Sequence, residues 1–263
     1  METTLRTRYC HEAPSAQTAL DIFKGVWKSS LPMALNLQTG AAKQFFADPR
    51  VMWANSVLPG GFAGLEILEL GPFEGYDSYL FSKFGAKLVT SIEANNINFL
   101  KCLLLKDTLG LRSVHFLHGD SLKYLDNTNS RFDVIWASGV LYHSEQPINL
   151  LASIATHTDR IFLWTHFFTS EMLMNANRPY FDSGKNLEQV FQGQAYTLHY
   201  RSYLNDAQDL PLHYEGGLQS FSYWMTRRDI ERVLRTLGFS SLRYHETGEM
   251  EGMPYFGLLA ERG

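Results

Sequence analysis

Short apolar runs alternate with helical patterns between about residues 64 and 165 of this chain, and this alternation constrains the fold more than any other feature. Each run is too short for a helix and ends in glycine or a polar residue; the runs begin at Leu65, Leu88, Val114, Phe132 and Ile161. Strands that alternate with helices are joined by right-handed crossovers and lie parallel. We therefore predict an α/β fold with a doubly wound, Rossmann-like, mostly parallel sheet.

Glycines mark the ends of the first two predicted helices. One helix is expected over residues 76–84, because Gly85 stands where a left-handed residue follows a helix. A second is expected over 95–109, which begins with asparagines that suit an N-cap and ends before Gly110. Both helices would pack against the sheet.

The last 40 or so residues continue the pattern. Thr226 opens a helix whose acidic first turn and apolar stripe run to Gly238. Two further strands, near 241–244 and 255–260, close the chain and bring the predicted sheet to seven strands.

Two segments stand outside the alternation. Residues 168–224 are polar, rich in Tyr and Phe, and broken by Gly and Pro, which predicts an insertion over the sheet's edge; long insertions of this kind are more often functional than idle. Residues 1–55 are expected to form a helical N-terminal lead-in or cap, which leaves 56–263 as the main domain.

Composition excludes several classes of protein. Apolar residues make up 45% of the chain and its formal charge is −4, so neither disorder nor a coat for nucleic acid is expected. Only two cysteines are present and the nine histidines are scattered, which predicts no disulfide framework and no metal site. The sequence shows neither a membrane span nor a secretory signal, so we expect a cytoplasmic protein with no membrane partner.

Polar residues and glycines stand at the predicted strand ends, where ligands bind in open parallel sheets. The four strand ends in question are Glu69-Leu-Gly71-Pro72-Phe73-Glu-Gly75, Glu93-Ala94, Gly119-Asp120-Ser121 and Ser138-Gly139-Val-Leu-Tyr142-His143. Their occurrence at one edge predicts a ligand site there.

The residue types at this edge suit a nucleoside. A glycine turn lets backbone N–H groups approach a ligand, a carboxylate at Glu93 can accept from both ribose hydroxyls, and Asp120 can accept from an adenine amine. The alternatives are structural: Gly71 and Gly75 would only form a tight turn, and Asp120 would only cap a short helix over 121–125.

The stretch 69–143 resembles the class I S-adenosylmethionine (SAM)-dependent methyltransferases. Glu69-x-Gly71-x-x-x-Gly75 is similar to their first motif, Glu93 to their ribose-binding acidic residue, Gly119-Asp120 to their adenine-contacting motif, and the segment from Phe132 to His143 to their fourth motif. The last two strands look like the family's C-terminal β-hairpin. The resemblance implies SAM as cofactor, held by Glu69, Gly71, Pro72, Phe73, Gly75, Glu93, Ala94, Gly119, Asp120, Ser121, Ser138 and Gly139.

One position departs from the family pattern. Many members carry a glycine midway between Gly71 and Gly75, where this chain has Phe73. Phe73 and Tyr76 also occupy two of the glycine sites that a nicotinamide-dependent oxidoreductase needs for its pyrophosphate, which disfavours that alternative. The Gly-Val-Leu-Tyr-His phrase is similar as well to enzymes that modify the tRNA wobble uridine with a carboxylated SAM.

The reaction that the resemblance implies is an in-line methyl displacement, for which an enzyme supplies alignment, exclusion of water and a base. His143 and His166 are the candidate bases, since an unperturbed imidazole has a pKa near neutrality. Tyr142 is the candidate aromatic contact of the sulfonium. Each has a structural alternative: the histidines would only be hydrogen-bonded to the backbone, and the tyrosine would only pack in the core. Trp27 would either cover the cofactor pocket or anchor the core.

The acceptor is predicted only as a class. Modest acidity and an insertion with several tyrosines, among them Tyr203 and Tyr214, favour O- or N-methylation of a small or medium-sized organic molecule over RNA. RNA binding would rest on Arg6, Arg8, Lys24 and Lys28. We predict SAM and not carboxylated SAM as the cofactor, because the strand-end motifs hold no Lys or Arg that could bind the additional carboxylate of carboxylated SAM. The alternatives for the function are a tRNA-modifying methyl- or carboxymethyltransferase and a catalytically silent SAM-binding partner module. The insertion over 168–224 is predicted to act as a lid and, with the N-terminal lead-in, to form the acceptor pocket; the alternative for the insertion is a homodimerisation arm.

Overall fold

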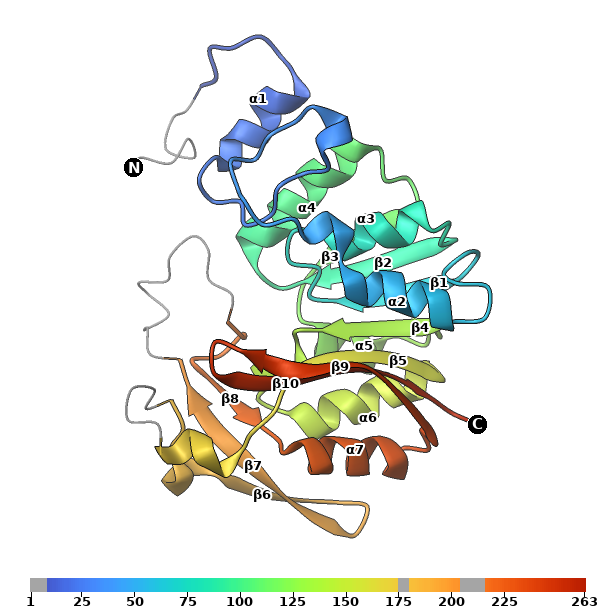
Figure 1. The fold of residues 1–263 in the computed structure, drawn as a ribbon, viewed down its shortest axis with the longest axis vertical. Helices are drawn as coiled ribbons and strands as arrows, with labels where there is room; N and C mark the ends of the chain where they lie inside the picture. The colour runs from blue at the N-terminus through green and yellow to red at the C-terminus, as the bar shows by residue number, and fades with distance from the viewer. Residues whose placement is uncertain (1–8, 175–179, 204–215) are drawn as a thin grey trace. The chain divides into compact units, whose positions relative to one another are not determined.

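Seven strands form the main sheet of the computed structural model, which describes residues 9–174, 180–203 and 216–263 (Figure 1). Their order is β3-β2-β1-β4-β5-β10-β9. Neighbours run parallel in the pairs β1–β2, β2–β3 and β4–β5, whereas β10 is antiparallel to both β5 and β9. The strands are β1 (Glu66–Leu70), β2 (Leu88–Glu93), β3 (Val114–His118), β4 (Val134–Ser138), β5 (Arg160–His166), β9 (Ser241–Met250) and β10 (Met253–Glu261). The predicted doubly wound sheet and the C-terminal hairpin are confirmed.

The predicted helix ends also match the structure. Asn95 caps its helix because Oδ1 accepts from the amides of Ile97 and Asn98 at 2.9 and 3.0 Å, and Gly110 ends it in a left-handed conformation with φ +62°. Every helix in the described part of the chain is too short or too polar to cross a bilayer. The helices are α1 (Ala16–Leu20), α2 (Pro49–Val57), α3 (Tyr76–Lys83), α4 (Asn96–Leu109), α5 (Ser121–Asn127), α6 (Pro147–His157) and α7 (Arg227–Thr236).

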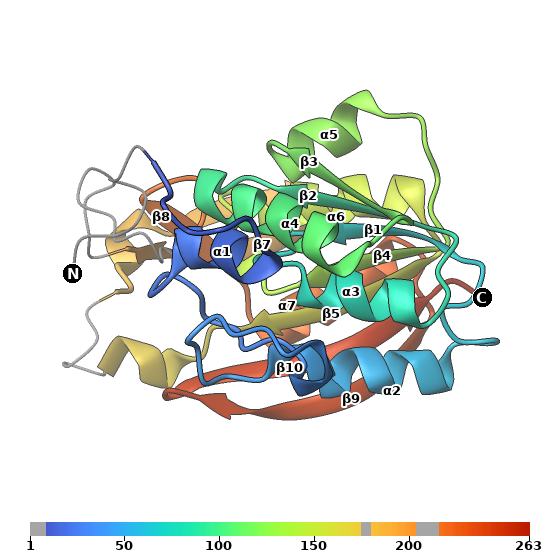
Figure 2. The ribbon, with the colours of Figure 1, turned by 90° about the horizontal axis from the view of Figure 1, so that it is seen from above.

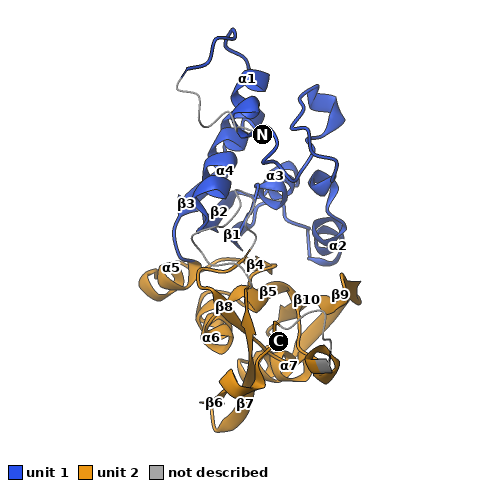
Figure 3. Ribbon diagram, turned by 90° about the vertical axis from the view of Figure 1, so that its left-hand side faces the viewer, with its two compact units in different colours: residues 1–120, 211–213 blue, residues 121–210, 214–263 orange. Residues whose placement is uncertain are grey.

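The chain divides into two compact units, the first comprising 1–120 and 211–213 and the second 121–210 and 214–263 (Figure 3). In the first unit, α3 and α4 pack against β2 and β3 (Figure 2). In the second, α6 packs against α5 and α7, and β9 and β10 run side by side as a long hairpin (Figure 2). Each unit buries its own aliphatic and aromatic side chains, such as Phe81 in the first and Trp136 in the second.

The lead-in, residues 1–55, is helical in part over its described residues. Its described residues form α1, short 3₁₀ turns and the start of α2, which extends to Val57. Long irregular stretches separate these pieces, and the lead-in belongs to the first unit and not to a unit of its own. The 3₁₀ turns in the described part of the chain are Asp21–Phe23, Met33–Leu35, Phe45–Ala47, Leu141–His143, Ser170–Met174 and Ser183–Lys185. Arg6 and Arg8, two of the residues for RNA binding, lie outside the described residues.

The insertion over 168–224 contains a second sheet, which the sequence pattern did not predict. Its three antiparallel strands, in the order β6-β7-β8, are β6 (Leu187–Phe191), β7 (Gln194–Ser202) and β8 (Phe221–Trp224). The side chains of β6 are exposed or half-buried. Because such a strand needs no apolar run, its sequence lacks the pattern that marks a core strand. Tyr214 lies outside the described residues.

Candidate functional site

The loop between β1 and α3 takes a left-handed backbone at every second residue. The φ angles are +65° at Gly71, +58° at Phe73 and +75° at Gly75. At Gly75 a Cβ would also lie 3.1 Å from the ring of Phe116, so both backbone and packing require glycine there. A bulky residue rarely adopts such an angle. Phe73 therefore takes the left-handed backbone that suits the family's usual glycine at this position.

Glu93, at the end of β2, is hydrogen-bonded to this loop. Its Oε2 accepts from the amide of Phe73 at 2.9 Å, and its Oε1 accepts from the amide of Asn95 at 2.8 Å. Burial raises the pKa of Glu93 to about 7, although the backbone N–H groups act in the opposite direction. A carboxylate offers about four lone-pair sites, and the amides of Phe73, Asn95 and Ala94 already act on that of Glu93, so its binding of ribose hydroxyls stays a prediction.

Glu69 is engaged inside the first unit. Its Oε2 accepts hydrogen bonds from the hydroxyls of Ser78 and Ser91, the latter at 2.7 Å, and the side chain is buried. Burial also raises the pKa of this carboxyl to about 7, against the effect of the two serines. Glu69 thus connects β1 to α3 and β2, and its contact with a cofactor stays a prediction.

A buried ion pair that the sequence analysis missed joins the loop to the lead-in. Glu74 is fully buried, and Lys101 on α4 donates to its Oε1 at 2.7 Å. The same carboxylate accepts from the amides of Lys28 and Ser29 at 2.9 Å each, while Lys101 also donates to the carbonyl of Val26 at 2.9 Å. Residues 26–29 are therefore held against the glycine loop by charge-assisted bonds.

Trp27 lies within this contact. Its Nε1 donates to the carbonyl of Leu20 at 3.0 Å, and Lys101 Nζ lies 5.5 Å from its ring centroid. The ring belongs to a buried cluster with Phe23 and Leu105. The structure thus favours the core-anchor interpretation of Trp27 over the pocket-cover one.

The other predicted cofactor residues take the places that the pattern indicated. In the first unit, Pro72 is buried, and Ala94 and Asp120 are half-buried at the ends of β2 and β3. Gly119 donates its amide to the carbonyl of Glu93 at 3.0 Å, so the ends of β2 and β3 meet. In the second unit, Ser121 opens α5, Ser138 ends β4, and Gly139 turns the chain with φ +79° and donates to the carbonyl of Trp164 at 2.9 Å.

The three predicted catalytic residues lie together in one aromatic cluster of the second unit, which we define as Tyr142, His143, Trp164, His166 and Trp224. The ring of Tyr142 lies 4.1 Å from that of His143, 4.8 Å from that of His166 and 5.6 Å from that of Trp224. His166 stacks on Trp224 with an interplanar angle of 9°. Residues from β4's end, β5 and the insertion thus meet around one tyrosine.

Both histidines of the cluster have a pKa below that of free imidazole. Burial lowers the pKa of His143 to about 3, and the charge of Arg201 adds to the effect. Burial also lowers the pKa of His166, although a bond to a carbonyl works against it. That bond joins Nδ1 to the oxygen of Pro254 at 3.2 Å, so Nδ1 carries the proton and Nε2 keeps a lone pair. His166 is the better placed proton acceptor of the two, since a group with a pKa near 3 is a weak base at neutral pH.

The insertion contacts His143 at two points and the adjoining Ser144 at a third. The hydroxyl of Tyr203 is hydrogen-bonded to Nδ1 of His143. A Cβ built on Gly217 would lie 2.3 Å from the carbonyl oxygen of His143, so the two backbones touch. The amide of Tyr223 donates to the carbonyl of Ser144 at 3.0 Å. The insertion therefore packs directly on the segment that carries the predicted catalytic residues.

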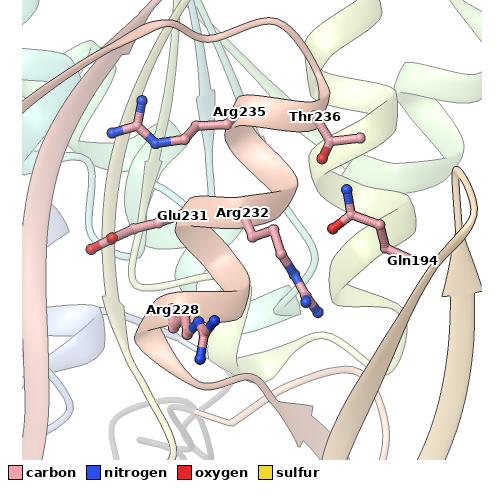
Figure 4. A pocket seen from close by; sticks show the side chains of 6 residues that line it. All are labelled: Gln194, Arg228, Glu231, Arg232, Arg235 and Thr236. Atoms are coloured by element: carbon pink, nitrogen blue, oxygen red, sulfur yellow. The ribbon is translucent and has the colours of Figure 1, made fainter.

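A cavity of about 490 Å³ in the second unit is a separate feature (Figure 4). Gln194 at the start of β7 faces five residues of α7, and none of the predicted site residues lines the cavity. The lining comprises Gln194, Arg228, Glu231, Arg232, Arg235 and Thr236. Among the described residues, no group of three or more His, Cys, Asp or Glu could hold a metal ion.

Comparison with solved structures identifies the fold. The N-terminal domain of EvdMO1, crystallised in the presence of S-adenosylhomocysteine (SAH) and D-fucose, matches with a TM-score of 0.66 and 18% identity over 90% of this chain and 91% of that one. Magnesium protoporphyrin IX methyltransferase (ChlM) from Synechocystis PCC 6803 with bound SAH matches with a TM-score of 0.53 and 18% identity, over 82% of this chain and 81% of that one.

A third structure agrees with these two. A SAM-dependent methyltransferase from Mesorhizobium loti matches with a TM-score of 0.54 and 13% identity, over 82% of this chain and all of that one. No family model and no curated protein matches the sequence. The chain has the fold of the class I SAM-dependent methyltransferases.

Proposed function

We propose that this protein is a SAM-dependent methyltransferase that acts on a small or medium-sized organic acceptor, at oxygen or nitrogen. The observation that carries the proposal is the hydrogen bond from the amide of Phe73 to Glu93, because it joins the left-handed loop to the acidic residue within one rigid arrangement. That pairing of a tight turn with a strand-end carboxylate suits the ribose of a nucleoside cofactor.

SAM supplies an electrophilic methyl group when it is bound. In the proposed complex Glu93 accepts hydrogen bonds from the ribose hydroxyls, and Asp120 accepts from the adenine amine. The loop 71–75 approaches the cofactor by its backbone, and the ion pair of Glu74 with Lys101 keeps that loop in place. These roles use the residues of the first unit.

The second unit holds the proposed acceptor residues. The rings of Tyr142 and Trp224 shield the reacting group from water, and the Nε2 of His166 accepts the proton that the acceptor loses. His143 is proposed to orient Tyr203 of the insertion. We further propose that the insertion over 168–224 forms most of the acceptor pocket of a domain that spans 56–263, and that the protein works in the cytoplasm.

One experiment tests the activity directly. The purified protein is incubated with labelled SAM and, in separate reactions, with fractions of a small-molecule extract or with RNA, and SAH release is compared between the wild type and Glu93→Ala. The proposal expects acceptor-dependent release that Glu93→Ala abolishes. SAM binding without release from any fraction, including RNA, would instead favour a silent SAM-binding module, and release with RNA alone would favour a tRNA-modifying enzyme.

A further inference from the structure

Arg201, on β7 of the insertion, places its guanidinium among three aromatic rings. The guanidinium carbon lies 4.9 Å from the ring centroid of Tyr203, 5.2 Å from that of Trp224 and 5.3 Å from that of Tyr180. Trp224 belongs to the aromatic cluster and Tyr203 is bonded to His143. The cation is therefore part of the surroundings of the predicted catalytic residues.

This cation lacks a carboxylate among the residues that the structure describes. Its Nε and Nη1 are buried and donate to no acceptor there, and no Asp or Glu of the described ranges forms an ion pair with it. Other buried cations are neutralised, since Lys101 pairs with Glu74 at 2.7 Å and Arg50 pairs with Asp48. Burying an unpaired charge is costly, so the arrangement favours a counterion from outside the described residues, such as an anionic ligand.

The titratable groups around Arg201 carry no negative charge at neutral pH, so they would not repel an anion. His143 and His166 are both neutral at neutral pH, because burial and the charge of Arg201 lower the pKa of each. Tyr203 is neutral as well, since burial raises its pKa above the ordinary value. Arg201 thus contributes the only formal charge among these four residues.

We propose that Arg201 binds an oxyanion of the acceptor, a carboxylate or a phosphate, and so selects anionic organic molecules as substrates. A guanidinium matches the planar, bidentate geometry of a carboxylate and also binds phosphate. The surrounding rings fit an acceptor whose anion is attached to an apolar or aromatic body. The inference deepens the proposed function and rests on it in one respect, namely that the bound anion belongs to the methyl acceptor. Binding of an anion at Arg201 can be tested separately.

The test is a titration of the protein, with and without SAH, by three probes of similar shape: benzoate, phenyl phosphate and the neutral benzamide. We expect the wild type to bind at least one anion more tightly than benzamide. Arg201→Gln should weaken that anion about 10- to 100-fold, as expected for a lost charge-assisted hydrogen bond, and leave benzamide unchanged. Whether benzoate or phenyl phosphate binds more tightly identifies the oxyanion.

Arg232 provides a matched control. Its guanidinium also lies over a tyrosine ring, 4.2 Å from that of Tyr196, but it is paired with Asp229 at 2.9 Å and donates to the carbonyl of Ala195. Arg232→Gln should leave anion binding unchanged. Equal affinity of the wild type for benzoate, phenyl phosphate and benzamide, or an equal loss in both variants, would overturn the proposal.

Thermal unfolding gives an independent readout. If Arg201 has no counterion in the folded chain, Arg201→Met should keep or raise Tm, whereas a drop in Tm would show a structural partner and contradict the proposal. SAH affinity of Arg201→Gln should equal that of the wild type, which separates this test from failure of the proposed function. Carboxylated SAM released from the purified wild type, but not from Arg201→Gln, would move the anion site to the cofactor and overturn the assignment to the acceptor.

Discussion

The amide of Phe73 donates a 2.9 Å hydrogen bond to Oε2 of Glu93. Phe73, the residue that departs from the glycine pattern of the loop, therefore holds the carboxylate on which the proposed cofactor binding depends. Phe73 itself has a φ of +58°. A residue type that departs from the family pattern thus adopts a left-handed backbone, which glycine takes more readily.

Replacing Phe73 separates the cost of its backbone from the packing of its ring. Phe73→Ala loses the ring but keeps a side chain at a left-handed angle, whereas Phe73→Gly loses both. We expect Phe73→Gly to be more stable than Phe73→Ala by about 1 kcal/mol in denaturant unfolding. At Tyr79, inside α3, the order should reverse, because glycine costs about 1 kcal/mol in a helix interior. The same order at both positions would contradict this account.

The ion pair of Lys101 and Glu74 should be strongly coupled. Lys101→Met leaves the Glu74 carboxylate buried with only backbone partners, and we expect a loss of about 3–5 kcal/mol in the free energy of unfolding. Adding Glu74→Gln should recover part of that loss. Hydrogen exchange at the amides of Lys28 and Ser29 reports on the lead-in and should accelerate in the single variant; unchanged exchange would mean that the pair does not hold it.

His143 should make the protein sensitive to acid. Its pKa is about 3 in the folded protein and 6.5 for a free side chain, so the unfolded state takes up a proton that the folded state refuses. Stability is therefore lost as pH falls from about 6.5 towards 3, and His143→Gln should flatten that part of the stability curve. His115, which is exposed on β3, is the control site. A wild-type slope in His143→Gln would refute the assignment.

Much of the fold could be predicted from the sequence because its signals are local. The helix ends at Gly110 and Thr226 and the strand at Leu88 each depend on a few neighbouring residues, and the structure matches them. The antiparallel sheet of the insertion escaped prediction because its polar strands lack a core run and pair with each other instead.

The candidate site was predictable only in part. Glu93 and the loop glycines are marked by their spacing, but the pairing of Lys101 with Glu74 joins residues 27 positions apart on different elements, and nothing in the sequence pairs them. The sequence placed His143 and His166 at strand ends, but their contact with Tyr142 is seen only in the structure. The proposed role of Arg201 depends on the absence of a nearby carboxylate among the described residues, which only a folded chain reveals.

Calorimetric titration of SAM against the wild type and Glu93→Gln, at pH 6 and pH 8, tests the central claim most directly. The pKa of Glu93 is about 7, so its ionised form, the better acceptor, predominates only at the higher pH. We predict tighter wild-type binding at pH 8 than at pH 6. At pH 8 Glu93→Gln should lose about 1–3 kcal/mol of binding free energy and show no pH dependence, while Glu66→Gln on the same sheet behaves as wild type. Equal affinity of Glu93→Gln and the wild type at both pH values would contradict the account.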